Sequence, residues 1–197
     1  MSEELQNRIV GICGRKGSGK STALREIVSS QERVIIFDTM GEHESPNVFT
    51  SLGPCLSYLA RHARDTFFHC SLRPYSNERQ SLDALAREAF RIGNVCFAVE
   101  EVPHFSTAVS QPAGLDLLSR MGRHKQVDLV WTAQRLAEVS KRLTSATDVF
   151  ILYACKEPRD LEALADRCGS DVAVQVQKLG LHGRLVFDVL AYEAKII

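Results

Sequence analysis

The sequence lacks the features that would anchor a chain in a membrane or cross-link it. Its longest apolar run, residues 149–155, is far too short to cross a bilayer. Residues 1–5 contain neither a basic segment nor an apolar one, so we expect no secretory leader. No two of its six cysteines have C-x-x-C spacing, and most lie inside apolar runs. We therefore expect a cytoplasmic protein whose cysteines are buried, reduced and hydrophobic in character.

The chain also lacks net charge, internal repeats and low-complexity tracts. Its 24 basic residues balance its 24 acidic residues, so any contact with nucleic acid must come from a local basic patch. With 197 residues, of which 45% are hydrophobic and 24% charged, the chain is long enough to bury a full core. We expect one α/β domain over residues 1–197.

What the sequence does have is a phosphate-binding motif near its start. Residues 9–13 are apolar, and Gly14, Gly19, Lys20 and Ser21 then occupy the fixed positions of G-x-x-x-x-G-K-[ST]. Apolar residues at helical spacing follow the motif. This order predicts a strand, a glycine-rich loop (the P-loop) and a helix, which is the context that the motif requires.

The motif predicts a site for a nucleoside triphosphate with Mg²⁺. Backbone N–H groups of the loop and the helix start would hold the phosphates, and Gly17 would allow the tight turn. Lys20 would neutralise the β- and γ-phosphate oxygens, and the Ser21 hydroxyl would ligate Mg²⁺. The expected nucleotide-binding residues are Gly14, Arg15, Lys16, Gly17, Ser18, Gly19, Lys20, Ser21 and Thr22.

Two adjacent glutamates follow a second apolar run. Residues 95–99 are apolar without alternation, as in a central parallel strand, and Glu100 and Glu101 come directly after them. Open α/β sheets bind their ligands at the carboxyl ends of such strands. One carboxylate would hold Mg²⁺ through water while the other polarises the attacking water. The alternative is that both are solvated residues opening a loop.

Strand and helix patterns alternate along the rest of the chain. Further strands are expected at residues 33–38, 66–70, 127–131, 148–153, 185–189 and 191–197. Helices are expected around residues 23–28, 56–63, 82–90, 115–121, 161–165 and 172–179, with an exposed loop at 45–54. The alternation predicts a mostly parallel central sheet with helices on both faces.

The order of the motifs resembles the HerA/FtsK superfamily of ring-forming DNA-pumping ATPases. After the P-loop come D-x-x-G-E-H at residues 38–43, the acid pair, G-R-H at 122–124, and a strand ending in T-A-Q-R at 132–135. The similarity covers residues 9–167. It implies a RecA-like (ASCE) P-loop NTPase fold, ATP and Mg²⁺ as cofactors, and a homo-oligomeric ring, most often of six subunits.

The resemblance also implies roles for individual residues. Glu100 matches the acid that supports Mg²⁺, where the family more often has Asp, and Glu101 matches the glutamate that orients water. The longer side chain at position 100 leaves open which of the two has which role. Gln134 matches the polar sensor of the γ-phosphate. Arg123 stands where the family carries an arginine finger for a neighbouring subunit, with Arg120 as the substitute. A solvated basic helix end is the other interpretation of Arg123.

In size and motif order the chain is most similar to genome-packaging ATPases of membrane-containing icosahedral viruses and their small phage relatives. This implies translocation of double-stranded DNA without sequence specificity, a capsid or membrane docking partner, and a place in the host cytoplasm or the virion. Residues 103–112 and the Lys141 and Arg142 pair are candidate DNA contacts, although surface solvation explains both.

Two other function classes stay open. One is a small nucleotide or metabolite kinase, against which the sequence shows no arginine-rich cluster that could form a lid. The other is an ATP-gated assembly protein that binds nucleotide and hydrolyses it slowly without moving DNA.

Overall fold

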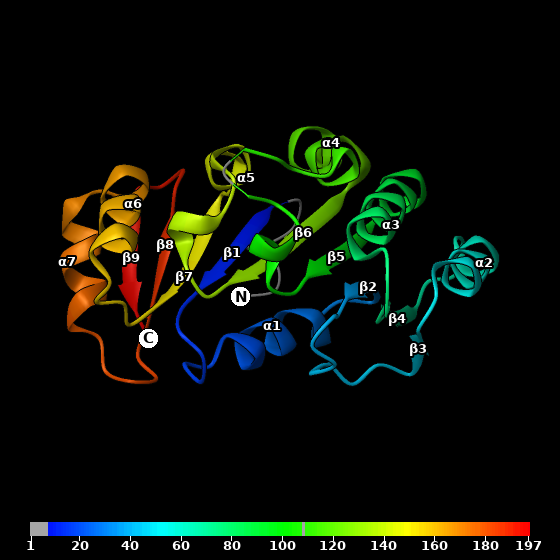
Figure 1. Cartoon of the computed structure of the whole chain (residues 1–197), viewed down its shortest axis with the longest axis horizontal. Coiled ribbons are helices and arrows are strands. Elements are labelled where there is room, and N and C mark those ends of the chain that lie inside the picture. Colours follow the sequence, from blue (N-terminus) through cyan, green and yellow to red (C-terminus); the bar gives the residue numbers. More distant parts are fainter. Residues whose placement is uncertain (1–7, 108) are drawn as a thin grey trace.

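The strands form one mixed sheet in the computed structural model, which describes residues 8–107 and 109–197 (Figure 1). The N-terminal residues 1–5 discussed above, and Ala108 in the candidate loop, lie outside the described residues. The strands are β1 (Ile9–Cys13), β2 (Arg33–Phe37), β3 (Asn47–Phe49), β4 (Phe68–Leu72), β5 (Val95–Val99), β6 (Val127–Ala133), β7 (Val149–Tyr153), β8 (Arg184–Asp188) and β9 (Glu193–Ile196).

The sheet is mostly parallel, as the alternating pattern predicts. Within the described ranges its order is β3-β4-β2-β5-β6-β1-β7-β8-β9. Every neighbouring pair from β3 to β7 is parallel, and β8 and β9 are antiparallel to their neighbours. The carboxyl ends of the parallel strands therefore lie along one edge of the sheet, and their amino ends along the other.

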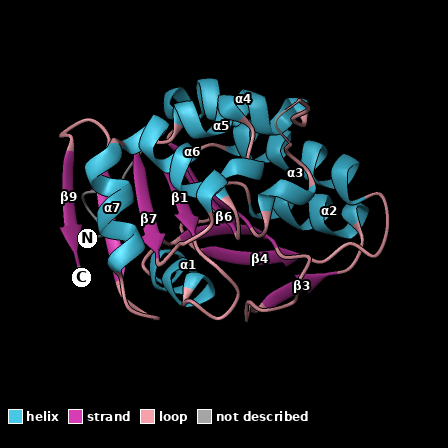
Figure 2. Ribbon diagram, turned by 60° about the vertical axis from the view of Figure 1, so that its left-hand side comes forward, coloured by secondary structure: helices cyan, strands magenta, loops and turns pink. Residues whose placement is uncertain are grey.

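The helices cover the two faces unequally. They are α1 (Lys20–Ser29), α2 (Leu52–His62), α3 (Glu78–Ile92), α4 (Ala113–Met121), α5 (Lys141–Ala146), α6 (Pro158–Cys168) and α7 (Ser170–Lys178), with short 3₁₀ turns η2 (Val102–His104), η3 (Gly122–Lys125) and η4 (Leu136–Glu138). Among these helices α1 lies by itself on one face, and α2 to α7 lie on the other (Figures 1 and 2). Helices on both faces are thus confirmed, with a strong bias to one side.

The core follows the alternation of side chains along the buried strands. In β5, Cys96 and Ala98 pack toward α1, whereas Val95, Phe97 and Val99 pack into the larger core on the other side. The expected burial of the cysteines is confirmed for five of the six, and Cys155 is half-buried. None of the helices in residues 8–107 and 109–197 is long and apolar enough to span a membrane.

Strand β6 separates the P-loop strand from the strand that carries the two glutamates. It pairs in parallel with β1 on one side and β5 on the other. The ends of β1 and β5 are therefore two strand spacings apart, roughly 10 Å. An additional strand in this position is the arrangement of the RecA-like (ASCE) fold that the sequence predicts.

Some boundaries differ from the expected ones. The loop expected at residues 45–54 contains β3 and the first turn of α2, where Pro54 is tolerated because early helical N–H groups need no intrahelical partner. Strand β4 begins two residues later than expected, and β6 continues to Ala133. Lys141 and Arg142 open the short helix α5, which was not expected and whose N-cap is Ser140.

We predict that Gly11→Ala destabilises the fold. A Cβ at Gly11 would lie 2.3 Å from Cζ2 of Trp131, which is fully buried and cannot move freely because its Nε1 donates to Thr147 Oγ1 (3.1 Å). Overpacking of this kind reduces the free energy of unfolding by about 1–3 kcal/mol. Denaturant unfolding measures the loss. Gly53→Ala is the control, since Gly53 lies in α2 facing open space and should be neutral or stabilising.

Candidate active site

The P-loop lies at the carboxyl edge of the sheet and is held by backbone pairing. The Gly14 N–H donates to Ala133 O (3.1 Å) at the end of β6, and the Ser18 N–H donates to Arg15 O (3.2 Å) across the loop. Gly19 has a φ of 112°, a conformation that disfavours any side chain. The loop therefore passes directly into α1 at Lys20, as the motif predicts.

Tyr153, at the end of β7, supports the P-loop from the neighbouring strand. Its hydroxyl donates to Gly19 O (3.0 Å), and a Cβ on Gly14 would lie 2.6 Å from the Tyr153 Cβ. His182, in the turn between α7 and β8, places Nδ1 3.4 Å from Ser18 O. No motif in the sequence indicated either contact, because both depend on how β7 and β8 pair.

Lys20 and Ser21 lie where the motif predicts, at the start of α1. The Lys20 Nζ donates to Arg15 O (3.3 Å), and partial burial lowers the pKa of Lys20, against the opposing effect of nearby Glu101. The Ser21 hydroxyl donates to Glu42 Oε2 (2.6 Å) and lies 3.5 Å from Glu100 Oε1. The hydroxyl expected to ligate Mg²⁺ thus lies between two carboxylates.

Glu101 is held by the end of β6. Its backbone is left-handed (φ 48°), its N–H donates to the Thr132 hydroxyl (2.9 Å), and its Oε1 accepts from the Gln134 N–H (3.0 Å). The side chain is almost buried, whereas Gln134 is exposed. The glutamate expected to orient water and the expected phosphate sensor are therefore in direct contact, through the sensor's backbone.

The segment after β2 folds around the Asp38 carboxylate. Asp38 is fully buried and accepts from the N–H groups of Gly41 (2.8 Å), Glu42 (3.1 Å) and His43 (3.2 Å). Arg73, at the end of β4, donates through Nε to Asp38 Oδ2 (2.9 Å) and also to His43 O. Burial acts to raise the pKa of Asp38, but its hydrogen bonds and Arg73 hold it below the ordinary value.

Glu100 is buried and only partly satisfied. Its Oε1 lies 3.2 Å from His43 Nε2, while its Oε2 has no hydrogen-bond partner. Burial raises the pKa of Glu100, and the contribution of His43 in the other direction does not cancel it. A buried carboxylate oxygen without a donor is stabilised by a cation. Together with the Ser21 hydroxyl, Glu100 therefore fits the expected role of holding Mg²⁺, whose ligands are oxygen atoms.

Arg123 and Arg120 are not brought to this edge. Arg123 lies in η3, just before β6 begins, and its guanidinium donates to Asp148 Oδ1 (2.9 Å) before the start of β7. Arg120 lies in the last turn of α4, and its guanidinium is 3.6 Å from Asp116 Oδ2. The length of β6, about 20 Å for its residues, separates Arg123 from the P-loop of the same chain. The side chain of Arg123 is 62% exposed and that of Arg120 is 75% exposed.

Arg135, next to Gln134, is already engaged by acids. Its guanidinium lies within 3.7 Å of carboxylates on Glu138, Glu157 and Asp160, and these interactions raise its pKa. A cavity of about 640 Å³ opens beside it on the β7 side of the P-loop. Its lining includes Gly14, Gln134, Arg135, Tyr153, Asp160 and Leu181.

Sequence reasoning missed several residues of the site. Asp38, Glu42 and His43 belong to the D-x-x-G-E-H pattern that was noted without a role, so a signal was present. Thr132 belongs to the T-A-Q-R pattern, which was likewise noted without a role for this residue. Arg73 and Tyr153 gave no signal, because isolated polar residues at strand ends are common. Their positions become meaningful only once the strand order is known.

Taken together, a G-x-x-x-x-G-K-S loop after β1, an acid pair after β5 and an intervening β6 define a P-loop NTPase fold of the RecA-like (ASCE) kind. No model of a known protein family matches the sequence, and no curated protein sequence does. Solved structures do match it. The genome packaging NTPase B204 from Sulfolobus turreted icosahedral virus 2, in complex with AMPPCP, superposes over 96% of both chains with a TM-score of 0.77 and 18% identity.

Two further structures extend this likeness. The pCW3 conjugation coupling protein TcpA, with ATPgS, matches 92% of this chain and 57% of its own, with a TM-score of 0.59 and 14% identity. The N-terminal domain of zonular occludens toxin from Neisseria meningitidis matches 96% of this chain and 93% of its own, with a TM-score of 0.51 and 12% identity. At these identities the likeness shows a shared fold. The matched structures confirm the P-loop NTPase fold that the resemblance to HerA/FtsK-type ATPases implies.

We predict that Thr132→Val destabilises the protein more than Thr132→Ser. Valine keeps the volume but removes the hydroxyl that accepts the buried Glu101 N–H, which reduces the free energy of unfolding by about 1–3 kcal/mol. Serine keeps the acceptor. Thermal and denaturant unfolding compare the variants. A larger loss for serine than for valine would instead assign the effect to packing of the methyl group, which serine lacks.

Proposed function

We propose that the chain hydrolyses ATP as one subunit of a HerA/FtsK-type ring motor that moves double-stranded DNA, as in packaging of a viral or phage genome. The observation that supports this best is the division of the site between two edges. The P-loop, the glutamates and Gln134 meet at the carboxyl edge, while exposed Arg123 lies at the amino edge. A subunit of this shape lends its arginine to a neighbour's nucleotide.

The chemistry follows from the positions of the side chains at the carboxyl edge. Backbone N–H groups of the P-loop and Lys20 bind the triphosphate, and Mg²⁺, held through Ser21 and Glu100, would neutralise charge on the phosphate oxygens. Glu101 orients the attacking water and accepts its proton. The Glu101 carboxylate accepts a hydrogen bond from the N–H of Gln134, the residue that would face the γ-phosphate. Loss of the γ-phosphate would therefore be transmitted through Gln134 to Glu101 and to β6.

An arginine from a neighbouring subunit completes the site. Arg73 and Arg135, near the carboxyl edge, are already paired with Asp38 and with an acid cluster. Arg123 is also paired, with Asp148 Oδ1, but its side chain is 62% exposed, against 29% for Arg73 and 39% for Arg135, and it lies at the amino edge of the sheet. An arginine supplied in this way contributes about 10³–10⁵ in rate, so hydrolysis depends on assembly.

DNA contact would come from loops repeated around the ring, binding phosphates without reading sequence. Residues 103–112 remain the better candidate of the two. They begin within η2 at the carboxyl edge, and Val109 is 95% exposed. Arg79 on α3 donates to both Phe105 O and Ser110 Oγ. Arg142, by contrast, lies 3.8 Å from the Asp116 carboxylate.

We predict that Lys20→Ala and Glu101→Gln separate binding from hydrolysis. Lys20→Ala removes a charge-assisted hydrogen bond worth about 1.5–3 kcal/mol, so nucleotide affinity should fall at least about tenfold. Glu101→Gln should retain that affinity and lose about 10²- to 10⁴-fold in turnover. Fluorescent nucleotide binding and phosphate release measure the two. Normal turnover in Glu101→Gln would show that the acid is misassigned.

We predict that two inactive variants restore each other when mixed. A boundary between an Arg123→Ala subunit, which keeps Glu101, and a Glu101→Gln subunit, which keeps Arg123, has one complete site. ATPase activity should therefore appear on mixing. A double variant carrying both changes, mixed with Arg123→Ala, is the matched control and should give none. Failure of the first mixture to recover any activity would refute an arginine acting in trans.

ATPase rate measured across protein concentration, with and without double-stranded DNA, tests the proposed function as a whole. A motor should accelerate on assembly and on DNA. Transfer of phosphate to a nucleoside or metabolite would identify a kinase. Nucleotide-dependent assembly without displacement of a triplex strand from linear DNA would identify an ATP-gated assembly protein.

A further inference from the structure

The segment at residues 38–43 carries polar groups that the proposed mechanism does not use. Glu42 and His43 both reach toward the P-loop from β2, a strand separated from β1 by β5 and β6. We propose that Glu42 is a second carboxylate for the Mg²⁺ ion that accompanies the nucleotide, acting beside Glu100. This inference rests on the proposed nucleotide site.

The position of Glu42 is imposed by the backbone around it. The buried Asp38 carboxylate accepts the N–H groups of Gly41, Glu42 and His43, and Gly41 has a φ of 72°, which turns the chain back toward α1. Arg73 in turn fixes Asp38. The Glu42 side chain is therefore directed to the Ser21 hydroxyl by a rigid turn, although the residue itself is exposed.

The negative charges around Ser21 would be stabilised by a cation. Its hydroxyl is 2.6 Å from Glu42 Oε2 and 3.5 Å from Glu100 Oε1, so two carboxylates converge on one donor. Glu100 is 4% exposed, and its Oε2 has no hydrogen-bond partner. Lys20, the neighbouring cation, is bonded to Arg15 O. A divalent ion near Ser21 would neutralise both acids at once.

The arrangement suits Mg²⁺ bound with a nucleotide. Mg²⁺ keeps several water molecules and is commonly held by one or two carboxylates together with substrate phosphates. Over residues 8–107 and 109–197, no group of three or more His, Cys, Asp or Glu side chains is placed to hold a metal alone. Ser21, Glu42 and Glu100 would accordingly share the ion with the phosphates, with the carboxylates accepting hydrogen bonds from its waters.

His43 supports this arrangement by holding the Glu100 carboxylate. Its side chain is 1% exposed and lies against Glu100 Oε1, and its carbonyl oxygen accepts from Arg73. His43 acts through Glu100 and is therefore a positioning residue: it contacts Glu100 Oε1, the oxygen that Ser21 also approaches. The turn after β2 therefore supplies one acid for the metal, Glu42, and through His43 orients the other acid, Glu100.

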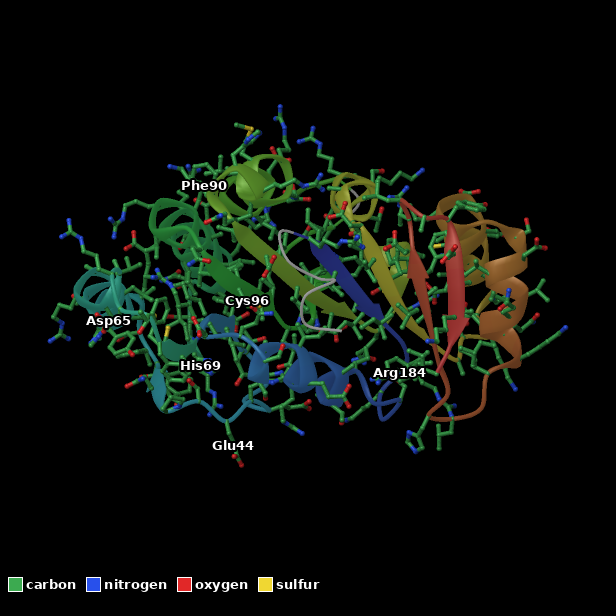
Figure 3. All side chains as sticks on the ribbon, turned by 180° about the vertical axis from the view of Figure 1, so that it is seen from behind. Glu44, Asp65, His69, Phe90, Cys96 and Arg184 are labelled. Atoms are coloured by element: carbon green, nitrogen blue, oxygen red, sulfur yellow. The ribbon has the colours of Figure 1, made fainter. Side chains whose placement is uncertain are left out.

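The experiment compares Glu42→Gln with Glu44→Gln in the full chain. Glu44 comes directly after this segment, and its side chain points away from the molecule (Figure 3), so the matched variant makes the same charge change outside the site. The Mg²⁺ concentration for half-maximal binding of a fluorescent ATPγS analogue is measured for each. Mn²⁺ binding by electron paramagnetic resonance in the presence of nucleotide gives a second readout independent of turnover.

We expect Glu42→Gln to need about 10- to 100-fold more Mg²⁺, with weaker Mn²⁺ binding, while its nucleotide affinity in EDTA stays at the wild-type value. Glu44→Gln should match the wild type throughout. An unchanged metal midpoint in Glu42→Gln would overturn the inference. Tighter nucleotide binding without metal would also overturn it, because Glu42 would then merely repel the phosphates. Absence of metal-dependent binding in the wild type would instead refute the nucleotide site itself.

Discussion

Parallel pairing of β2, β5, β6 and β1 is the constraint on which the rest of the structure depends. The backbone hydrogen bonds that align these strands bring their carboxyl ends to one edge. Each strand then delivers one part of the site: the Asp38 turn, the glutamates, Gln134 and the P-loop. If one of these strands occupied another position in the sheet, every sequence motif would remain, but the residues of the site would no longer lie together.

The second organising factor is the compensation of negative charge at that edge. Asp38 is satisfied internally, by three N–H groups and Arg73, and serves as a fixed support. Glu101 is paired with the backbone of Gln134. Glu100 alone of these acids keeps a buried oxygen without a donor among the described residues. The protein thus gives hydrogen-bond donors to Asp38 and Glu101 and leaves one buried oxygen of Glu100 without a donor.

Local patterns were sufficient for the fold class and for the residues fixed by sequence spacing. The P-loop, the apolar strand before Glu100 and the helices with clear 3.6-residue periodicity could be predicted because their signal lies within a few residues. Strand β3 could not, since its short run in a Pro- and Ser-rich segment is stabilised by pairing with β4 and by contacts with Tyr58 of α2, both distant in sequence. Nor could the contacts of Tyr153 or Thr132, which arise from strand order. The likeness to B204 over nearly the whole chain agrees with the predicted fold.

The distance between the P-loop and Arg123 also restricts the symmetry of any assembly. A two-fold dimer repeats the same patch on both partners, so an arginine acting in trans would require that patch to include both ends of β6, whereas a contact between the carboxyl edge of one subunit and the amino edge of the next needs only one end from each. A contact that joins unlike edges is heterologous, so under the proposed function the two terminal subunits of an open series each leave one of these edges without a neighbour until the series closes. The smallest complete unit under this geometry is a closed cycle, and an open chain of subunits keeps one catalytically incomplete end.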